Sequence, residues 1–225
     1  MWRNRIFMGA VLLLPLVVPG VTSASTKSYS TTYSFNLSPG SQTVNLSQFH
    51  DLGGTLTLTK VTLDLDGDIH ARVEAENDDP TLTASMSVSL LGTFDGKVMD
   101  GLTELLHASG SISDTHGPVS VTVSTPPIRG GSDYHDYGTL NDSDSDSDSL
   151  TSGLGYFIGT STIPVDITGQ GGYSVQGTSN STSWVTDFSA SGTAKITYEY
   201  TPEPATMAML GLGALGLAAR RRRSR

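Results

Sequence analysis

The 225-residue sequence contains no cysteine, so no disulfide, thiolate nucleophile or cysteine metal ligand is possible. It also lacks the H-E-x-x-H, G-x-S-x-G and P-loop patterns of common hydrolases and nucleotide-binding enzymes. Its five histidines are scattered along the chain without the spacing of metal ligands. These absences favour a protein without catalytic activity. A pair of carboxylates that hydrolyses extracellular polysaccharide stays open as an alternative.

Basic residues are scarce outside the two ends of the chain. Seven of the 13 lysines and arginines lie in the terminal segments, which leaves six in residues 25–200, where 21 acidic residues lie. The net charge of this body is therefore near −15, compared with −9 for the whole chain. Such a charge argues against nucleic acid and anionic lipid as partners, and it is compatible with bound cations.

The first 24 residues have the three parts of a secretory signal peptide. Arg3 and Arg5 supply the positive start, residues 6–21 form an apolar stretch, and Ala24 ends a run of small residues. The pattern predicts a signal helix over residues 1–24, export through the Sec machinery, and cleavage between Ala24 and Ser25. No segment implies a cofactor, apart from the calcium considered below for two acidic groups.

Residues 201–225 form a second targeting segment with three parts. In order, these are Pro202, Glu203 and Pro204, the apolar run 205–219, and the arginines Arg220, Arg221, Arg222 and Arg223. The apolar run predicts a hydrophobic helix of about 15 residues, or about 22 Å. A stable membrane span needs about 20 residues, so this helix is short. We therefore expect it to hold the inner membrane only transiently, with the arginines on the cytoplasmic side.

This C-terminal order resembles the PEP-CTERM tail, a family sometimes labelled as the C-terminus of ice-binding proteins. The resemblance implies cleavage near Pro202–Pro204 by an exosortase-type membrane enzyme. It also implies an inner-membrane-tethered intermediate, followed by delivery to the cell surface or the extracellular matrix. The label concerns the shared tail and says nothing of ice binding by residues 25–200.

Strict two-residue alternation of apolar and polar residues runs through the body. The alternating sets are Tyr29, Thr31, Tyr33, Phe35 and Leu37; Leu82, Ala84, Met86, Val88 and Leu90; Val119, Val121 and Val123; Ile163, Val165 and Ile167; and Ala194, Ile196, Tyr198 and Tyr200. This period is typical of strands with one wet face. Separated by Gly, Asn, Asp and Pro clusters, the runs predict an all-β antiparallel β-sandwich of about nine to eleven strands over residues 25–200.

Three stretches of the body need separate predictions. Residues 61–75 keep one alternation throughout, which predicts a single long strand that is bent or bulged at Gly67. Residues 95–110 show apolar positions at helical spacing and predict a short helix or a wide loop. Residues 137–150 include the alternating Asp/Ser run 142–149, which predicts a solvated acidic loop inserted between strands.

The body also resembles the choice-of-anchor E domain, an exported β domain found with several C-terminal sorting signals. The resemblance lies in residues 47–49, 54–56 and 61–63, which read Ser-Gln-Phe, Gly-Thr-Leu and Val-Thr-Leu, and in the closing run 192–200. It implies a β fold and carries over no functional residue and no activity.

Metal ligation is a possible role for two acidic groups. Asp78 and Asp79 lie in an Asn-Asp-Asp-Pro turn, and Asp133, His135 and Asp136 cluster in a Gly-flanked segment. Calcium or another divalent ion is compatible with these side chains. The simpler interpretation is a polar turn and a polar loop. The alternating charged residues from Asp64 to Glu76 are likewise interpreted as the wet face of one strand.

Carbohydrate or matrix-polymer binding is the alternative to a purely structural role. Tyr134, Tyr137, Tyr156 and Trp184 are the aromatic side chains that we consider as stacking platforms. Trp184 also fits the core, because Phe188 and Ala190 share its face in a regular strand. The main prediction is an exported, non-enzymatic β protein that an exosortase-type enzyme processes.

Overall fold

The structure is a computed structural model that describes residues 23–37, 39–124, 129–203 and 211–213. The chain divides into a β unit, Ala24–Thr201, and a second unit formed by the terminal segments Met1–Ser23 and Pro202–Arg225. The predicted signal helix lies outside the described residues. Of the predicted C-terminal helix, only residues 211–213 are described, and they are helical. Within the described ranges, no helix is long and apolar enough to cross a membrane.

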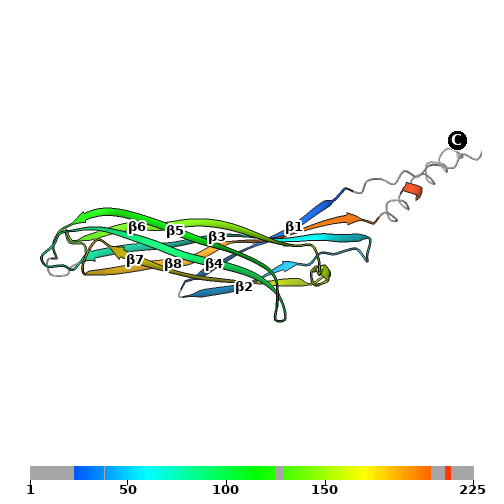
Figure 1. Cartoon of the computed structure of the whole chain (residues 1–225), viewed down its shortest axis with the longest axis horizontal. Helices are drawn as coiled ribbons and strands as arrows, with labels where there is room; N and C mark the ends of the chain where they lie inside the picture. Colours follow the sequence, from blue (N-terminus) through cyan, green and yellow to red (C-terminus); the bar gives the residue numbers. More distant parts are fainter. Residues whose placement is uncertain (1–22, 38, 125–128, 204–210, 214–225) are drawn as a thin grey trace, which may run out of the picture. The chain divides into compact units, whose positions relative to one another are not determined.

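The β unit consists of two four-stranded antiparallel sheets (Figure 1). One sheet has the order β1-β8-β3-β6, and the other has the order β2-β7-β4-β5. The elements are β1 Ser25–Asn36, β2 Gly40–Ser47, β3 Leu56–Asn77, β4 Ala84–Asp100, β5 Thr103–Val121, β6 Tyr134–Leu150, the 3-10 helix η1 Leu154–Phe157, β7 Thr162–Gln176 and β8 Ser181–Pro202. The described strands are fewer and longer than the nine to eleven that we predicted.

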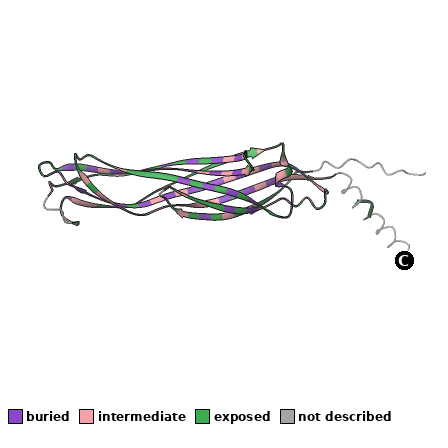
Figure 2. Ribbon diagram, turned by 90° about the horizontal axis from the view of Figure 1, so that it is seen from below, coloured by how far each residue is buried: buried purple, intermediate pink, exposed green. Residues whose placement is uncertain are grey.

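The inner faces of both sheets share one hydrophobic core. Buried and exposed residues alternate along the strands, as the period of two predicts (Figure 2). The sheets approach closely where Gly67 of β3 meets Phe94 of β4, since a Cβ on Gly67 would lie 2.6 Å from the ring. The apolar sets of the sequence lie largely inward, with Leu82 as an exposed exception.

Residues 61–75 lie within one long strand, β3, as predicted, but the pairing of β3 with β6 runs through Gly67 without a bulge. The register of β3 with β6 shifts between Arg72 and Glu74 instead. The predicted helix or loop over residues 95–110 is wrong, because these residues form the β4–β5 hairpin. Val98 and Leu106 face each other across this hairpin, so their apparent helical spacing comes from two paired strands.

The predicted acidic loop at residues 137–150 is also wrong, because this stretch belongs to strand β6. Each aspartate of the repeat accepts a hydrogen bond from a backbone N–H of β5, the edge strand of the other sheet. The donors and acceptors are His107 to Asp148 at 3.0 Å, Ser109 to Asp146 at 2.9 Å, Ser111 to Asp144 at 3.0 Å and Ser113 to Asp142 at 3.2 Å. We call this row the carboxylate ladder. It satisfies donors along an open sheet edge, which explains why a repeat with nothing to bury is ordered.

Candidate functional site

A bulge in β6 shapes the outer face of the first sheet. Arg72 pairs with Thr139, whereas Glu74 pairs with Asp136, so β6 has one residue more than β3 in this interval. Gly138 adopts a φ of 75°, a left-handed conformation that glycine takes without steric cost. The extra residue turns Tyr137 inward, where its hydroxyl donates to the Met86 carbonyl at 2.9 Å. Asp136 therefore stays on the outer face beside Arg72.

A second irregularity lies in β8 at Asp187, whose φ is 55°. Val185 and Phe188 both pack against the core, which a regular strand would not allow for an odd and an even position. Trp184 consequently lies on the outer face, where its ring is 6.3 Å from that of Tyr134. The prediction that Trp184 shares the inner face with Phe188 is therefore wrong, because the alternation reverses between them.

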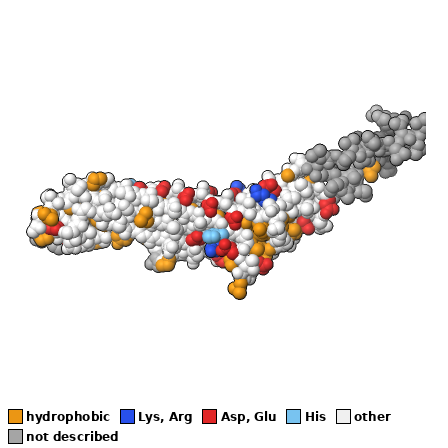
Figure 3. Space-filling model, viewed as in Figure 1, with side chains coloured by type: hydrophobic (Ala, Val, Ile, Leu, Met, Phe, Trp, Pro, Cys, Tyr) orange, Lys and Arg blue, Asp and Glu red, His pale blue; other side chains and the backbone are white. Residues whose placement is uncertain are grey.

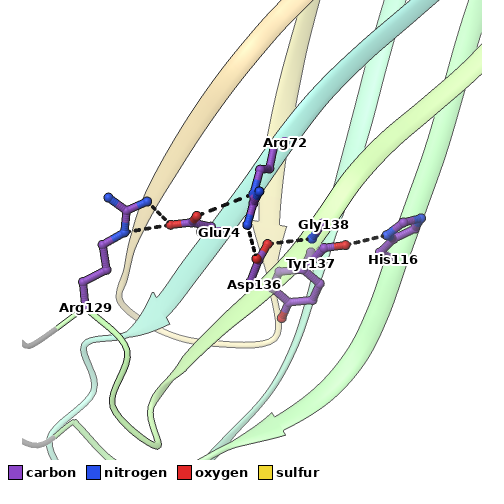
Figure 4. Close-up of polar contacts among 7 residues, drawn as sticks. All are labelled: Arg72, Glu74, His116, Arg129, Asp136, Tyr137 and Gly138. Carbon is purple, nitrogen blue, oxygen red and sulfur yellow. Dashed lines mark hydrogen bonds and ion pairs between the residues drawn. The ribbon is translucent and has the colours of Figure 1, made fainter.

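These two irregularities bring together six side chains, which we call the outer cluster. Its members are Arg72, Glu74, Arg129, Tyr134, Asp136 and Trp184. Arg129 donates from Nε to Glu74 Oε2 at 2.7 Å, and its guanidinium lies 5.3 Å from the centre of the Trp184 ring. Figure 4 shows Glu74 between the two guanidinium groups, with Arg72 Nε 3.7 Å from Oε1. Arg72 Nη2 also donates to Asp136 Oδ2 at 2.5 Å.

Charge pairing dominates the electrostatics of the outer cluster. The hydrogen bond and charge of Asp136 raise the pKa of Arg72, and those of Glu74 and Tyr134 raise the pKa of Arg129. The Gly138 N–H, which donates to Asp136 at 2.8 Å, lowers the pKa of Asp136 most, and Arg72 lowers it further. Burial raises the pKa of the Tyr134 hydroxyl. The cluster thus combines an aromatic surface with fixed guanidinium and carboxylate groups.

Glu76 lies beside this cluster and is almost fully buried, with 1% of its surface exposed. Its register partner is Tyr134 of β6. On the other side, β8 lies next to β3. The Ser189 hydroxyl of β8 contacts the His70 ring of β3, and the Asn180 carbonyl just before β8 accepts from the Asp78 N–H just after β3. Trp184 lies between these two contacts and is therefore alongside the same end of β3. The Tyr134 and Trp184 rings, whose centres are 6.3 Å apart, therefore come from the two strands that flank β3.

The Glu76 carboxyl has an unusual environment for an acid. Oε1 has no hydrogen-bond partner among the described residues. Burial raises the pKa of Glu76, and the negative charges of Asp133 and Asp78 raise it further. Glu74 and Glu76 are both buried, so the interpretation of the Asp64–Glu76 series as a solvated face fails at its C-terminal end.

The first predicted metal pair has a structural role in its turn. Asp79 Oδ1 accepts from the Thr81 N–H at 2.8 Å and from the Leu82 N–H at 2.9 Å, and Oδ2 accepts from the Ser179 hydroxyl. These hydrogen bonds lower the pKa of Asp79 well below its usual value. Asp78 accepts from the Thr182 hydroxyl at 2.8 Å. The Asp79 carboxylate therefore caps the turn.

The second predicted metal group does not converge. Asp133 is buried, His135 has its ring 4.7 Å from that of Tyr137, and Asp136 binds Arg72. Within the part of the chain that the structure describes, no three His, Asp or Glu side chains form a group that could hold a metal ion. Bound calcium therefore stays a prediction without a defined ligand set.

Two of the four predicted aromatic platforms come together. Tyr134 and Trp184 are neighbours in the outer cluster, whereas Tyr137 is buried. Tyr156 belongs to η1, where its ring lies edge-on to Phe157. No pattern in the sequence indicated Arg72, Glu74 or Arg129 as members of the site. The available signal for the bulge in β6 was Gly138, which directly follows the aromatic Tyr137.

The sorting residues lie at the boundary of the β unit. Ser25, the predicted first residue after signal cleavage, begins β1 and pairs with Tyr200 of β8. Pro202 is the last residue of β8, and Glu203 follows it directly. Pro204 and the arginines 220–223 lie outside the described residues.

Comparison with protein families identifies the C-terminal segment. Residues 201–223 match the model of the PEP-CTERM protein-sorting motif. The motif implies an exported protein that transits a membrane, is processed by an exosortase-type enzyme and is sorted to the cell surface. The resemblance of the body to choice-of-anchor E domains stays a prediction.

Further comparisons say little about the β unit. No curated protein matches the sequence. Among solved structures, chains of infectious bursal disease virus strains Gt and Gx align over 96% and 97% of this chain at 13% and 10% identity. Both TM-scores are 0.14, so these alignments support no inference. The chain spans about half the length of these viral chains, with 53% and 55% covered.

Proposed function

We propose that the chain is an exported, non-catalytic protein of the cell surface or extracellular matrix. The observation that carries this proposal is the sorting motif at residues 201–223, which begins where β8 ends. In this proposal, the Sec machinery exports the chain, and cleavage at Ala24 and near Pro202–Pro204 releases the β unit.

The arrangement of the carboxylates supports a role without catalysis. A polysaccharide hydrolase needs two carboxylates that face a substrate across an open space. In the outer cluster, Glu74 is held between two arginines and Asp136 binds Arg72, so both carboxylates are engaged in ion pairs. The ladder aspartates are similarly bound to the β5 backbone.

The proposal is tested by the intact mass of the native protein, measured separately from the cell envelope and the culture medium. We expect an N-terminus at Ser25 and a C-terminus near Pro202–Pro204. Glu203→Gln is expected to slow processing. Glu199→Gln, at a half-buried position of β8 whose carboxylate pairs with Lys60, is the matched control and should be processed normally. A full-length chain that keeps its arginines in the wild type would contradict the proposal.

A second candidate function is binding of a carbohydrate or matrix polymer. The specific observation in its favour is the pairing of Trp184 and Tyr134 with the guanidinium of Arg129 on the outer face. Aromatic rings beside planar hydrogen-bonding groups suit the apolar face and hydroxyls of a sugar. Retention on exopolysaccharide of the host should fall for Trp184→Ala and persist for Tyr173→Ala, an exposed tyrosine on the other sheet. Equal retention of both variants would contradict this function.

A further inference from the structure

One end of the β unit holds the first residue of β1 and the last residues of β8. Ser25 and Tyr200 form the first pair of the β1–β8 ladder. The ring of Phe49, in the β2–β3 connection, lies 5.0 Å from that of Tyr200. Phe49 also donates its N–H to the Phe157 carbonyl of η1 at 2.8 Å. The β2–β3 connection and η1 are therefore neighbours of the strand ends, and Figure 1 shows the β4–β5 turn projecting on the side of η1.

Large apolar side chains are exposed on each of these three connections. Leu52 of the β2–β3 connection is 57% exposed, Leu102 of the β4–β5 turn is 101% exposed, and Ile158 after η1 is 37% exposed. Figure 3 shows hydrophobic atoms at the tip of the projecting turn. Single exposed leucines are common on protein surfaces. These three side chains are of interest because of their position, since the chain continues from this end of the β unit into the sorting segment.

The sequence limits how far this end can lie from the membrane during sorting. The apolar run begins at residue 205, five residues beyond Tyr200, so the intervening chain spans at most about 17 Å. While the sorting segment holds the chain at the membrane, the three loops stay close to the lipid at a high effective concentration. Weak apolar contacts are then sufficient for docking, and they lose their effect once the tether is cut.

We propose that this end of the β unit docks on the lipid surface before processing, with Leu52, Leu102 and Ile158 entering the interfacial layer. The inference rests on the proposed sorting route through the membrane. The body charge near −15 opposes both anionic lipid and a second copy of the chain, so the fitting surface is electrically neutral lipid. Docking presents the residues around Glu203 to a membrane-embedded enzyme, and cleavage releases the unit.

The test uses the absence of cysteine, which allows one fluorophore at one introduced thiol. Full-length chains with Leu102→Cys, Leu52→Cys or Ile158→Cys carry an environment-sensitive dye and are mixed with phosphatidylcholine vesicles. Leu82→Cys is the matched control, because Leu82 is 61% exposed in the β3–β4 connection at the opposite end of β3. We expect co-flotation of all four proteins and a blue shift of dye emission only at positions 52, 102 and 158.

Each alternative gives a different result. Flotation with equal emission at positions 82 and 102 overturns the docking proposal and leaves the sorting route untouched. A blue shift that grows with the ratio of protein to lipid indicates a second copy as the occupant and also overturns it. No blue shift until a processing enzyme is added indicates docking on the enzyme, again against the proposal. Failure of sorting itself is detected separately, as an unprocessed intact mass.

Discussion

The carboxylate ladder provides the most direct test of how this fold is held together. Replacing Asp148 by Ala removes an acceptor for the His107 N–H at 3.0 Å and for the adjacent Ser149 N–H at 2.7 Å. A hydrogen bond to a charged acceptor contributes about 1.5 kcal/mol at the low end of its range, which suits a half-buried edge. We count only the bond between the sheets, because the local bond to Ser149 constrains little.

Repulsion between ladder aspartates opposes this gain. Neighbouring carboxylates two residues apart along a strand are about 6.8 Å apart, and in water they repel by about 0.6 kcal/mol. Physiological salt reduces this repulsion to about 0.3 kcal/mol, because the Debye length is about 8 Å. The net loss for Asp148→Ala is therefore about 1 kcal/mol, or about 2–4 °C in the melting temperature of a unit this size.

Thermal unfolding followed by circular dichroism measures this effect. Ser147→Ala, on the opposite face of the same strand, is the control and should leave the melting temperature unchanged. Asp148→Asn should fall between the two, because its amide oxygen still accepts one bond while its NH₂ faces a second donor. The drop for Asp148→Ala should be smaller at low salt, where removing a like charge is worth more. Equal melting temperatures for Asp148→Ala and Ser147→Ala would refute the stabilising role of the ladder.

Three further predictions concern acids and close packing. The hydrogen bond from the β5 backbone N–H lowers the pKa of Asp144. The Asp144 carboxylate therefore contributes stability above its unfolded pKa of about 3.9, and this contribution is lost as pH falls through the lower folded pKa. In an acid titration, Asp144→Asn should lose less stability than the wild type. Burial raises the pKa of Glu76, so the ionised carboxylate destabilises the folded protein at a pH above that pKa. Glu76→Gln should therefore raise the melting temperature at pH 8 and change it little at pH 4. Equal shifts at both pH values would count against burial as the cause. Gly67→Ala should destabilise by about 1–3 kcal/mol through overpacking against Phe94, and Gly172→Ala, which meets open space, should not.

Alternation predicted the all-β class and the inward residues, because the period of two is a local property that every wet-faced strand must satisfy. It failed where strand pairing decides the outcome. Residues 95–110 show apolar positions at helical spacing, yet the pairing of Val98 with Leu106 makes them a hairpin. The single strand over residues 61–75 was predictable because its phase never changes, while the register shift at Arg72–Glu74 depends on the partner strand β6.

The outer cluster could not be predicted for a related reason. A single bulge reverses the phase of every residue beyond it, so a local error moves a side chain to the other face. The irregularity at Asp187 moves the Trp184 side chain to the outer face, and the bulge at Gly138 moves the Tyr137 side chain to the inner face. Arg129 reaches Glu74 from a connection 55 residues away, and no spacing rule in the sequence relates the two.

The acidic repeat shows how a segment with nothing to bury becomes ordered. Asp and Ser have low strand propensity, and four like charges in a row repel, so local terms favour a solvated loop. The open edge of β5 reverses that balance, because its N–H groups need acceptors and the aspartates supply them at every second residue. The same carboxylates occupy the donors that another chain would need for edge-to-edge pairing, and they add negative charge there. For an exported protein that meets many copies of itself, the ladder therefore closes the fold and opposes aggregation at the same edge.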